Sequence, residues 1–224
     1  MKDYKYNKLQ SLTRYLHYIL YLLTLCSFFR MLSLVFIYFL TANNNTFNKN
    51  HFPKEFLEDL GHIYLTICCI EIISFIICAI LSLKWIYRSV ANLHSLNIPN
   101  VHYQPYQAAW CCILPIISFI APYQIVSELW FKSFAVLDDK TCYKRNIISV
   151  WWICFLFNAP TYRMSYAWIQ KDPFSPSGYI TGIINCLLVT IAALLFIKIT
   201  RAISQAQQTY AIMRPAPGET TETP

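Results

Sequence analysis

Four long apolar runs constrain this chain more than any other feature of its sequence. They cover about residues 15–40, 63–86, 147–168 and 179–199. Each run holds about 20 residues or more, the length that a helix needs to cross a bilayer core of about 30 Å. Charged residues make up 13% of the chain, whereas soluble domains carry about 25%. The sequence therefore predicts an all-α integral membrane bundle of four transmembrane helices, with a membrane domain over residues 15–200.

A fifth apolar segment, residues 105–131, differs from the four runs because prolines interrupt it. Its most apolar part, residues 108–121, has 14 residues and contains Pro115, and Pro122 follows directly. Apolar runs of about 10–14 residues are more often re-entrant, interfacial or buried than spanning. Proline ends or kinks a helix, although it is tolerated in the first turn of a new one. We therefore predict a Pro-broken re-entrant or interfacial helical element, with a continuous kinked span as the alternative.

The prolines also predict where this element breaks. We expect a short helix to about Leu114, a break across Pro115–Pro122, and a second helix from Pro122 that carries Glu128 and Trp130. Proline has no N–H and clashes with the carbonyl four residues back, so carbonyls in the break lose their helical partners. In lipid such groups need partners inside the protein or in a water-lined cavity. The break is therefore expected to pack against the end of the second run, near Arg88, away from acyl chains.

Basic residues decide between these topologies, because cytoplasmic loops of membrane proteins are rich in Lys and Arg. With four spans, a non-crossing element and the N-terminus inside, thirteen of the 18 Lys and Arg residues fall on the cytoplasmic side and three on the outer side. If the element crosses, the four basic residues between 132 and 145 and the three at the C-terminal end move outside, and the bias disappears. We therefore expect the protein in the inner (plasma) membrane with both termini cytoplasmic. Residues 1–14 would form the N-terminal segment and residues 201–224 a tail that is disordered after residue 213.

Arg30 and Glu71 are charged residues deep within the first and second runs. An ionisable residue inside a span is costly and usually faces the bundle interior with a partner. Arg30 lies ten residues from Leu40 and Glu71 eight residues from Ile63, depths of roughly 15 Å and 12 Å at the helical rise. Because the two helices are consecutive and antiparallel, the two charges can meet. They form either a structural ion pair that fixes helix register, or part of a proton or ion relay or a polar substrate pocket.

A second group of polar residues lies at the inner end of the second run. Arg88 and Asn92 are one helical turn apart, so their side chains share a face. Glu128 projects from the helix after the break, and an Arg88–Glu128 ion pair would fasten that helix to the second run. Arg88 or Asn92 would also donate to the carbonyls of the break. The alternative is that these residues extend their polar ends to the membrane interface.

Two glycines at the start of the fourth run form the pattern Gly178-x-x-x-Gly182. Small residues at this spacing let helix backbones approach closely in a membrane. We expect the motif to serve packing within the bundle rather than dimerisation.

A series of residues from the end of the second run into the third follows a recognisable order. It consists of Trp85, Tyr87, Arg88, Asn92, Leu93, Pro105, Trp110, Pro115, Ile116, Pro122, Tyr123, Gln124, Glu128, Leu129, Trp130, Trp151 and Trp152. This order resembles domain of unknown function 4328, a family of bacterial multi-pass membrane proteins, over roughly residues 9–201. The resemblance implies a membrane location and a compact helical bundle, and it implies no activity.

Other function classes find little support in the sequence. The chain has four glycines, too few for the common glycine-loop nucleotide sites. Its nine cysteines lie mostly in apolar runs without zinc-like spacing, and its five histidines offer no facing pair of haem ligands. Basic residues form no stripe with interleaved aromatics, which a nucleic-acid interface would show. We therefore expect no enzyme activity, no cofactor, no metal and no nucleic-acid partner; the partners are the lipid bilayer and either other membrane proteins or a second copy of the chain.

Two functions remain. The favoured one is a non-enzymatic interaction or sensing component of the membrane. The alternative is a small-solute or ion transporter or channel that uses the broken helix and Arg30 with Glu71. A sealed Arg30–Glu71 contact would favour the first function, and a water-filled cavity that reaches the pair would favour the second.

Overall fold

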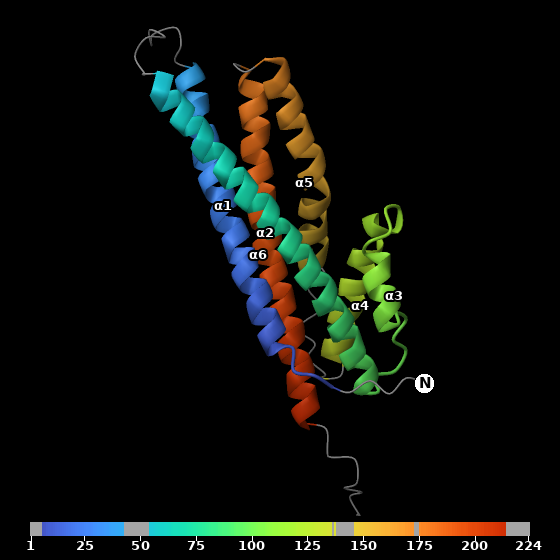
Figure 1. Ribbon diagram of the computed structural model, residues 1–224. Helices are drawn as coiled ribbons and strands as arrows, with labels where there is room; N and C mark the ends of the chain where they lie inside the picture. Colours follow the sequence, from blue (N-terminus) through green and yellow to red (C-terminus); the bar gives the residue numbers. More distant parts are fainter. Residues whose placement is uncertain (1–5, 43–53, 136, 138–145, 173–174, 214–224) are drawn as a thin grey trace, which may run out of the picture. The chain divides into compact units, whose positions relative to one another are not determined.

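The computed structural model describes residues 6–42, 54–135, 137, 146–172 and 175–213, and within these ranges the chain is helical without strands. Figure 1 labels the elements in chain order. They are α1 (Gln10–Ala42), α2 (Lys54–Ser95), α3 (Pro105–Cys111), the 3-10 helix η1 (Ile117–Phe119), α4 (Ala121–Ala135), α5 (Asn146–Lys171) and α6 (Pro176–Met213). The all-α class is confirmed for the described residues, whereas the tail expected to be disordered after residue 213 lies outside them.

Three of these helices are long and apolar enough to cross a membrane. By length and composition the candidate spans are Gln10–Phe39, Gly61–Ser95 and Pro176–Met213. They contain or overlap the first, second and fourth apolar runs. Helix α5, which holds the third run, does not meet the same criterion. Its middle carries Asn158, Pro160 and further polar residues, which lower its mean hydropathy, so the expected count of four spans is not reached by this measure.

The chain divides into two compact units. The first unit comprises Met1–Tyr15, Leu81–Ile148 and Lys198–Pro224, and the second comprises Leu16–Ile80 and Ser149–Ile197. The boundary falls inside α1, α2, α5 and α6, so each of these helices contributes to both units.

Two glycines of α6 let neighbouring helices of the second unit pack closely against it. A Cβ on Gly182 of α6 would lie 2.9 Å from both the Leu34 Cδ1 of α1 and the Ser165 Oγ of α5. A Cβ on Gly178 would lie 2.7 Å from the Ile169 side chain of α5. The expectation that Gly178 and Gly182 serve packing inside the bundle is therefore confirmed, since both face neighbouring helices of the same unit.

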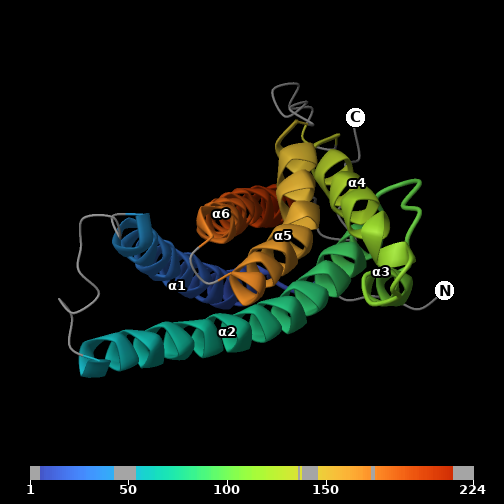
Figure 2. The same ribbon diagram turned by 90° about the horizontal axis from the view of Figure 1, so that it is seen from above.

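The first unit is built around the C-terminal part of α2. Trp85 and Leu93 of α2 are fully buried, as are Ile125 and Leu129 of α4 and Ile203 of α6. Helices α3 and α4 lie side by side and form a hairpin whose tip contains η1 (Figure 2). The unit therefore combines parts of long helices with the short, proline-interrupted element.

The break in residues 105–131 is confirmed. Helix α3 ends at Cys111, three residues earlier than expected, and α4 begins at Ala121, next to the expected Pro122. Several carbonyls freed by the break have local partners: Ser118 donates from its N–H to the Leu114 carbonyl at 2.7 Å and from its hydroxyl to the Pro115 carbonyl at 2.9 Å. The Ile120 N–H donates to the Ile117 carbonyl at 3.0 Å. The turn thus satisfies these backbone groups within its own sequence.

The expectation that the break packs against the end of the second run, near Arg88, is wrong, because the side chains of the break are exposed. Eight large apolar side chains of the hairpin are exposed: Tyr106, Trp110, Ile113, Leu114, Ile116, Ile117, Phe119 and Ile120. Ile116, at the tip, is 85% exposed. The physical reason is the local hydrogen bonding described above, because carbonyls that find partners in their own turn do not need a neighbouring helix. We refer to these eight side chains as the apolar tip.

Candidate functional site: two polar clusters

Arg30 and Glu71 form an ion pair in the second unit, as their matched depths predict. The Arg30 Nε lies 2.7 Å from the Glu71 Oε2. This N–H is not directed along a hydrogen bond, so the short contact is electrostatic. The Arg30 Nη2 supplies the directional contact by donating to the Glu71 Oε1 at 3.2 Å. The side chains are 4% and 13% exposed, so the pair is closely enclosed.

Asn185 of α6 extends this pair into a network. Its Oδ1 accepts from the Arg30 Nη2 at 2.8 Å. Its Nδ2 lies within hydrogen-bond distance of three acceptors on α5: the Asn158 Oδ1 at 2.6 Å, the Asn158 carbonyl at 2.8 Å and the Thr161 Oγ1 at 3.1 Å. Asn185 therefore joins the charged pair of α1 and α2 to the middle of α5.

The acceptors on α5 lie beside a proline. Pro160 stands inside α5, and a proline within a helix removes one backbone hydrogen bond and disturbs the turn before it. The Thr161 hydroxyl donates to the carbonyls of Phe157 and Asn158 at 2.7 Å and 2.9 Å. Side chains thus supply donors to this turn, as helices with proline require in a membrane.

We call this set the Arg30 cluster and define it as Arg30, Glu71, Asn158, Thr161, Tyr162 and Asn185. The Tyr162 ring completes it, with its centroid 5.9 Å from the Arg30 Cζ, a distance at which a guanidinium and an aromatic ring attract. The cluster therefore surrounds the guanidinium with a carboxylate, an amide oxygen and a π face. Chemically it holds a charge in place, and no part of it forms a nucleophile–base pair.

The first unit contains a second polar network, the Asn92 cluster, made of Asn7, Ser89, Asn92, Ser133 and Gln207. The Asn92 side chain pairs with the backbone of Asn7, accepting from its N–H at 3.1 Å and donating to its carbonyl at 3.0 Å. Asn92 also donates to the Gln207 Oε1 at 3.3 Å. Gln207 Nε2 then reaches the Ser89 carbonyl and the Ser133 Oγ, both at 3.2 Å. The cluster links the segment before α1 with α2, α4 and α6.

Trp85 makes a related connection. Its indole N–H lies 3.1 Å from the Thr13 Oγ1 and 3.3 Å from the Ser204 Oγ, and these two hydroxyls are 2.8 Å apart. Trp85 is fully buried, so this triangle satisfies the one polar atom of its ring. The contact joins α2 to α1 and α6 within the first unit.

The contacts predicted for Arg88 and Glu128 are not present. The Glu128 Oε1 accepts from the backbone N–H of His102, and no ion pair between Arg88 and Glu128 is formed although both residues are described. Asn92 uses its side chain on Asn7 and Gln207, so it does not donate to the break as expected. The reason is that the segment between α2 and α3 returns along α4 and supplies the nearer donor for Glu128.

The remaining residues singled out from the sequence belong to the broken element. Pro115 lies in the exposed tip and Pro122 in the first turn of α4. Trp130 is 7% exposed, and its ring centroid lies 4.9 Å from that of Phe134. These residues shape and anchor the hairpin.

Sequence reasoning found the charged half of the Arg30 cluster and missed its amides. Asn158 and Asn185 lie inside apolar runs, where a polar side chain must find a partner, and Asn158 stands two residues before Pro160. An asparagine inside an apolar run close to a proline therefore indicates a buried polar cluster. Gln207 had no comparable signal, because it lies beyond the last apolar run. Among the described residues no three His, Cys, Asp or Glu side chains are grouped so that they could hold a metal ion.

Comparison with known proteins gives one match. The family described as Domain of unknown function (DUF4328) matches residues 54–205, more than half of the chain. This range includes α3, η1, α4 and α5, together with Glu71, Asn92, Asn158 and Asn185. No curated protein and no solved structure matches the chain.

Proposed function

The chain belongs to the DUF4328 family, and from this premise we propose that it is a four-span plasma-membrane protein with both termini in the cytoplasm. We further propose that it acts as a non-enzymatic interaction or sensing component. The Arg30 cluster carries the functional part of this proposal. The topology rests on three further observations: the position of α5, the apolar tip and the distribution of basic residues.

The enclosed state of Arg30 argues against a transport path through the cluster. Its guanidinium is 4% exposed and contacts Glu71, Asn185 and the Tyr162 ring. A site that binds and releases a proton or solute needs access to water from one face. An ion pair with satisfied partners instead fixes the register of the helices that carry it. The cluster therefore supports a fixed scaffold inside the second unit.

Helix α5 supports the count of four spans through its contacts. Asn158 lies near the middle of α5 and bonds to Asn185, which bonds to Arg30. If α1, α2 and α6 cross the bilayer, α5 is therefore held at the depth of their shared polar cluster. Its 26 residues extend about 39 Å at the helical rise, which exceeds the bilayer core of about 30 Å. Polar residues lower its mean hydropathy, and two of them, Asn158 and Thr161, face the cluster.

The apolar tip supports a re-entrant or interfacial position for the hairpin. Exposed apolar patches mark interaction sites for membranes or proteins, and Trp and Tyr favour the membrane interface. Within the apolar tip, Tyr106 and Trp110 belong to α3 and lie nearest the polar base, and Ile116 lies farthest from it. At the base, the Tyr103 hydroxyl donates to the Gln124 Oε1 at 2.8 Å. This gradient from polar base to apolar tip fits a hairpin that dips into one leaflet.

A small-solute or ion carrier is the second candidate, favoured by one observation. Pro160 interrupts α5 next to Asn158 and Thr161, which contact Asn185 of the Arg30 cluster, and proline-interrupted helices form the binding sites of many transporters. In this function Glu71, which is 13% exposed, would be the group that exchanges a proton.

Reconstitution distinguishes the two candidates. We expect liposomes that contain the purified protein and a pH-sensitive dye to respond to an imposed pH or potassium gradient like protein-free liposomes. The carrier function predicts a flux that Glu71→Gln abolishes and Glu128→Gln retains, since both changes remove one carboxylate and only the first lies in the Arg30 cluster. A flux with that dependence would overturn the proposal.

The interaction function has a test of its own on α2. Only 11% of the most apolar stretch of this helix is buried, so most of its surface is available to a neighbour. A photo-crosslinking amino acid is introduced singly at Leu65, Ile72, Ile76 and Ile80, all of which are exposed. These four positions share one face of α2, and we expect a protein adduct of defined mass from that face in native membranes. Lipid adducts alone at every position would contradict the interaction function.

A further inference from the structure

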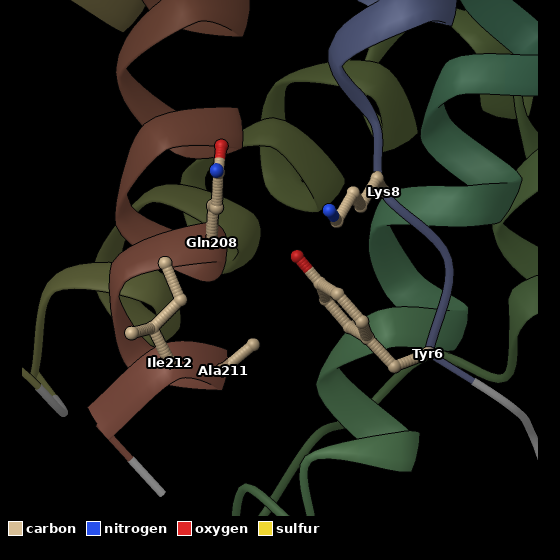
Figure 3. A pocket seen from close by; sticks show the side chains of 5 residues that line it. All are labelled: Tyr6, Lys8, Gln208, Ala211 and Ile212. Carbon is tan, nitrogen blue, oxygen red and sulfur yellow. The ribbon is translucent and has the colours of Figure 1, made fainter.

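The first unit contains a small pocket between the N-terminal segment and the end of α6. Its volume is about 220 Å³, and it is lined by Tyr6, Lys8, Gln208, Ala211 and Ile212. Pockets for drug-sized ligands are about 300–1,000 Å³, so this one suits a compact group. Figure 3 shows the Tyr6 hydroxyl and the Lys8 amino group both pointing from the N-terminal segment toward α6.

The Asn92 cluster explains why these two side chains face the same way. Residues 6–9 precede α1 and are not helical. The backbone of Asn7 donates one hydrogen bond to the Asn92 side chain and accepts another from it. In an extended segment, side chains two residues apart project to the same side. Fixing Asn7 on Asn92 therefore presents Tyr6 and Lys8 together to α6.

The polar groups of the pocket are suited to donate hydrogen bonds. Lys8 has an ammonium group and Tyr6 a hydroxyl. Gln10 Nε2 donates to the Gln208 Oε1 at 2.6 Å, which occupies the amide oxygen and leaves the Gln208 NH₂ group as the part that can donate. No Asp or Glu lines the pocket. Burial raises the pKa of Tyr6 above its ordinary value, so its hydroxyl keeps its proton at neutral pH.

The remaining wall is apolar. Ala211 and Ile212 belong to the last turn of α6, and Ile212 is 74% exposed. A positive charge and two neutral donors next to an exposed apolar side chain match an anion that carries a hydrocarbon chain. The same donors would also accept the anion without the chain.

We propose that this pocket binds a phosphate group, presented by an anionic phospholipid at the cytoplasmic face of the membrane. The lipid source rests on the proposed membrane topology, whereas the phosphate chemistry rests on the lining residues alone. Lys8 supplies the charge, and Tyr6 and Gln208 supply hydrogen bonds to the phosphate group.

Binding is measured on the full-length protein in an uncharged detergent with three soluble probes: dihexanoyl phosphatidic acid, inorganic phosphate and dihexanoylglycerol. We expect saturable binding of the phosphatidic acid that weakens roughly tenfold or more in Lys8→Ala, since a charged hydrogen bond is lost. Tyr6→Phe should weaken it severalfold, and Lys8→Arg should retain it. Lys198→Ala is the matched control, because Lys198 is exposed on the same helix and unit as Gln208 and does not line the pocket.

The three probes distinguish a phospholipid from free phosphate as the source of the bound phosphate group. Equal binding of inorganic phosphate, with the same dependence on Lys8, would support the phosphate site and overturn the lipid as its source. Absence of saturable binding to the wild type, equal binding of dihexanoylglycerol, or equal losses in Lys8→Ala and Lys198→Ala would overturn the pocket itself. Thermal midpoints check that each variant is folded. If the pocket fails these tests and the liposomes show no flux, the pocket proposal is overturned and the proposed interaction or sensing function is not.

Discussion

At the scale of single residues, the Arg30 cluster illustrates how a charge is kept inside apolar helices. Removing a guanidinium and a carboxylate from water costs several kcal/mol per ion, and their attraction offsets this only when other hydrogen bonds are satisfied. Asn185 provides that extra contact to Arg30. The ion pair and its amide therefore act together, and removing either charge leaves the other buried without its counter-charge.

We predict that Arg30→Met or Glu71→Leu alone destabilises the protein by about 3–5 kcal/mol, because the remaining charge is buried without its partner. The double variant Arg30→Met with Glu71→Leu should cost much less, since no charge remains. Unfolding of the purified variants in detergent, followed by circular dichroism, measures both effects. Equal and small losses for single and double variants would contradict a structural ion pair.

The sequence predicted the two charges of this cluster because the depth of a residue in a span can be counted from its end. It could not predict Asn185 as their partner, since that depends on how α6 rotates about its own axis. The same limit explains the wrong prediction for Arg88 and Glu128. Their helices were placed correctly, but the loop that brings the His102 N–H to Glu128 has no periodic pattern from which to infer its path.

At the scale of elements, the hairpin of α3, η1 and α4 shows what prolines determine and what they leave open. Pro115 and Pro122 predicted the break, and its position follows from the missing N–H groups. The prolines did not predict which residues surround the break. The hydroxyl and N–H of Ser118 satisfy the carbonyls of Pro115 and Leu114 locally, so the break needs no neighbouring helix. A turn that is complete in itself is free to present its apolar side chains outward.

We predict that the tip of the hairpin contacts acyl chains. A fluorophore attached to Ile116→Cys should be quenched by nitroxide-labelled lipids and protected from aqueous iodide, because Ile116 is 85% exposed at the apolar end. The same label on Gln104→Cys, at the exposed polar base, should show the opposite behaviour. Iodide quenching at both positions would place the hairpin in water.

The packing of α6 gives a second prediction at this scale. Gly182→Val should destabilise the protein by about 1–3 kcal/mol, because its added methyl groups enter the space held by Leu34 and Ser165. Gly61→Val is the control: nothing lies within 4 Å of its Cβ position, and valine is no worse than glycine in a helix. The two changes add the same atoms, so a difference in thermal midpoint measures the helix contact. Equal midpoints would show that Gly182 is not a packing site.

At the scale of the whole molecule, the sequence has four apolar runs, whereas three of the described helices are apolar enough to span a membrane. The difference has a physical reason. Hydropathy averages over all faces of a helix, whereas the membrane contacts only the outer one. Helix α5 directs Asn158 and Thr161 to Asn185 and exposes apolar side chains such as Val150, Ile153 and Phe157. A helix of this kind has a low mean hydropathy although one of its faces is apolar, and we propose that α5 crosses the membrane on that basis.

The sides of the membrane on which Cys142 and the C-terminal tail lie together decide between three, four and five crossings. With the N-terminus inside, the tail lies inside only if an even number of helices cross. Four crossings place both the tail and Cys142 in the cytoplasm. Three crossings place Cys142 inside and the tail outside. Five crossings, with the hairpin crossing as well, place both outside.

We predict the pattern of four crossings, since it alone keeps thirteen basic residues on the cytoplasmic side. A fluorescent protein fused after Pro224 should fluoresce and an alkaline phosphatase at the same position should be inactive, while an impermeant thiol reagent should label an introduced Asn45→Cys and leave Cys142 unlabelled. An active phosphatase with unlabelled Cys142 would remove α5 from the spans, and labelled Cys142 in intact cells would make the hairpin a crossing helix.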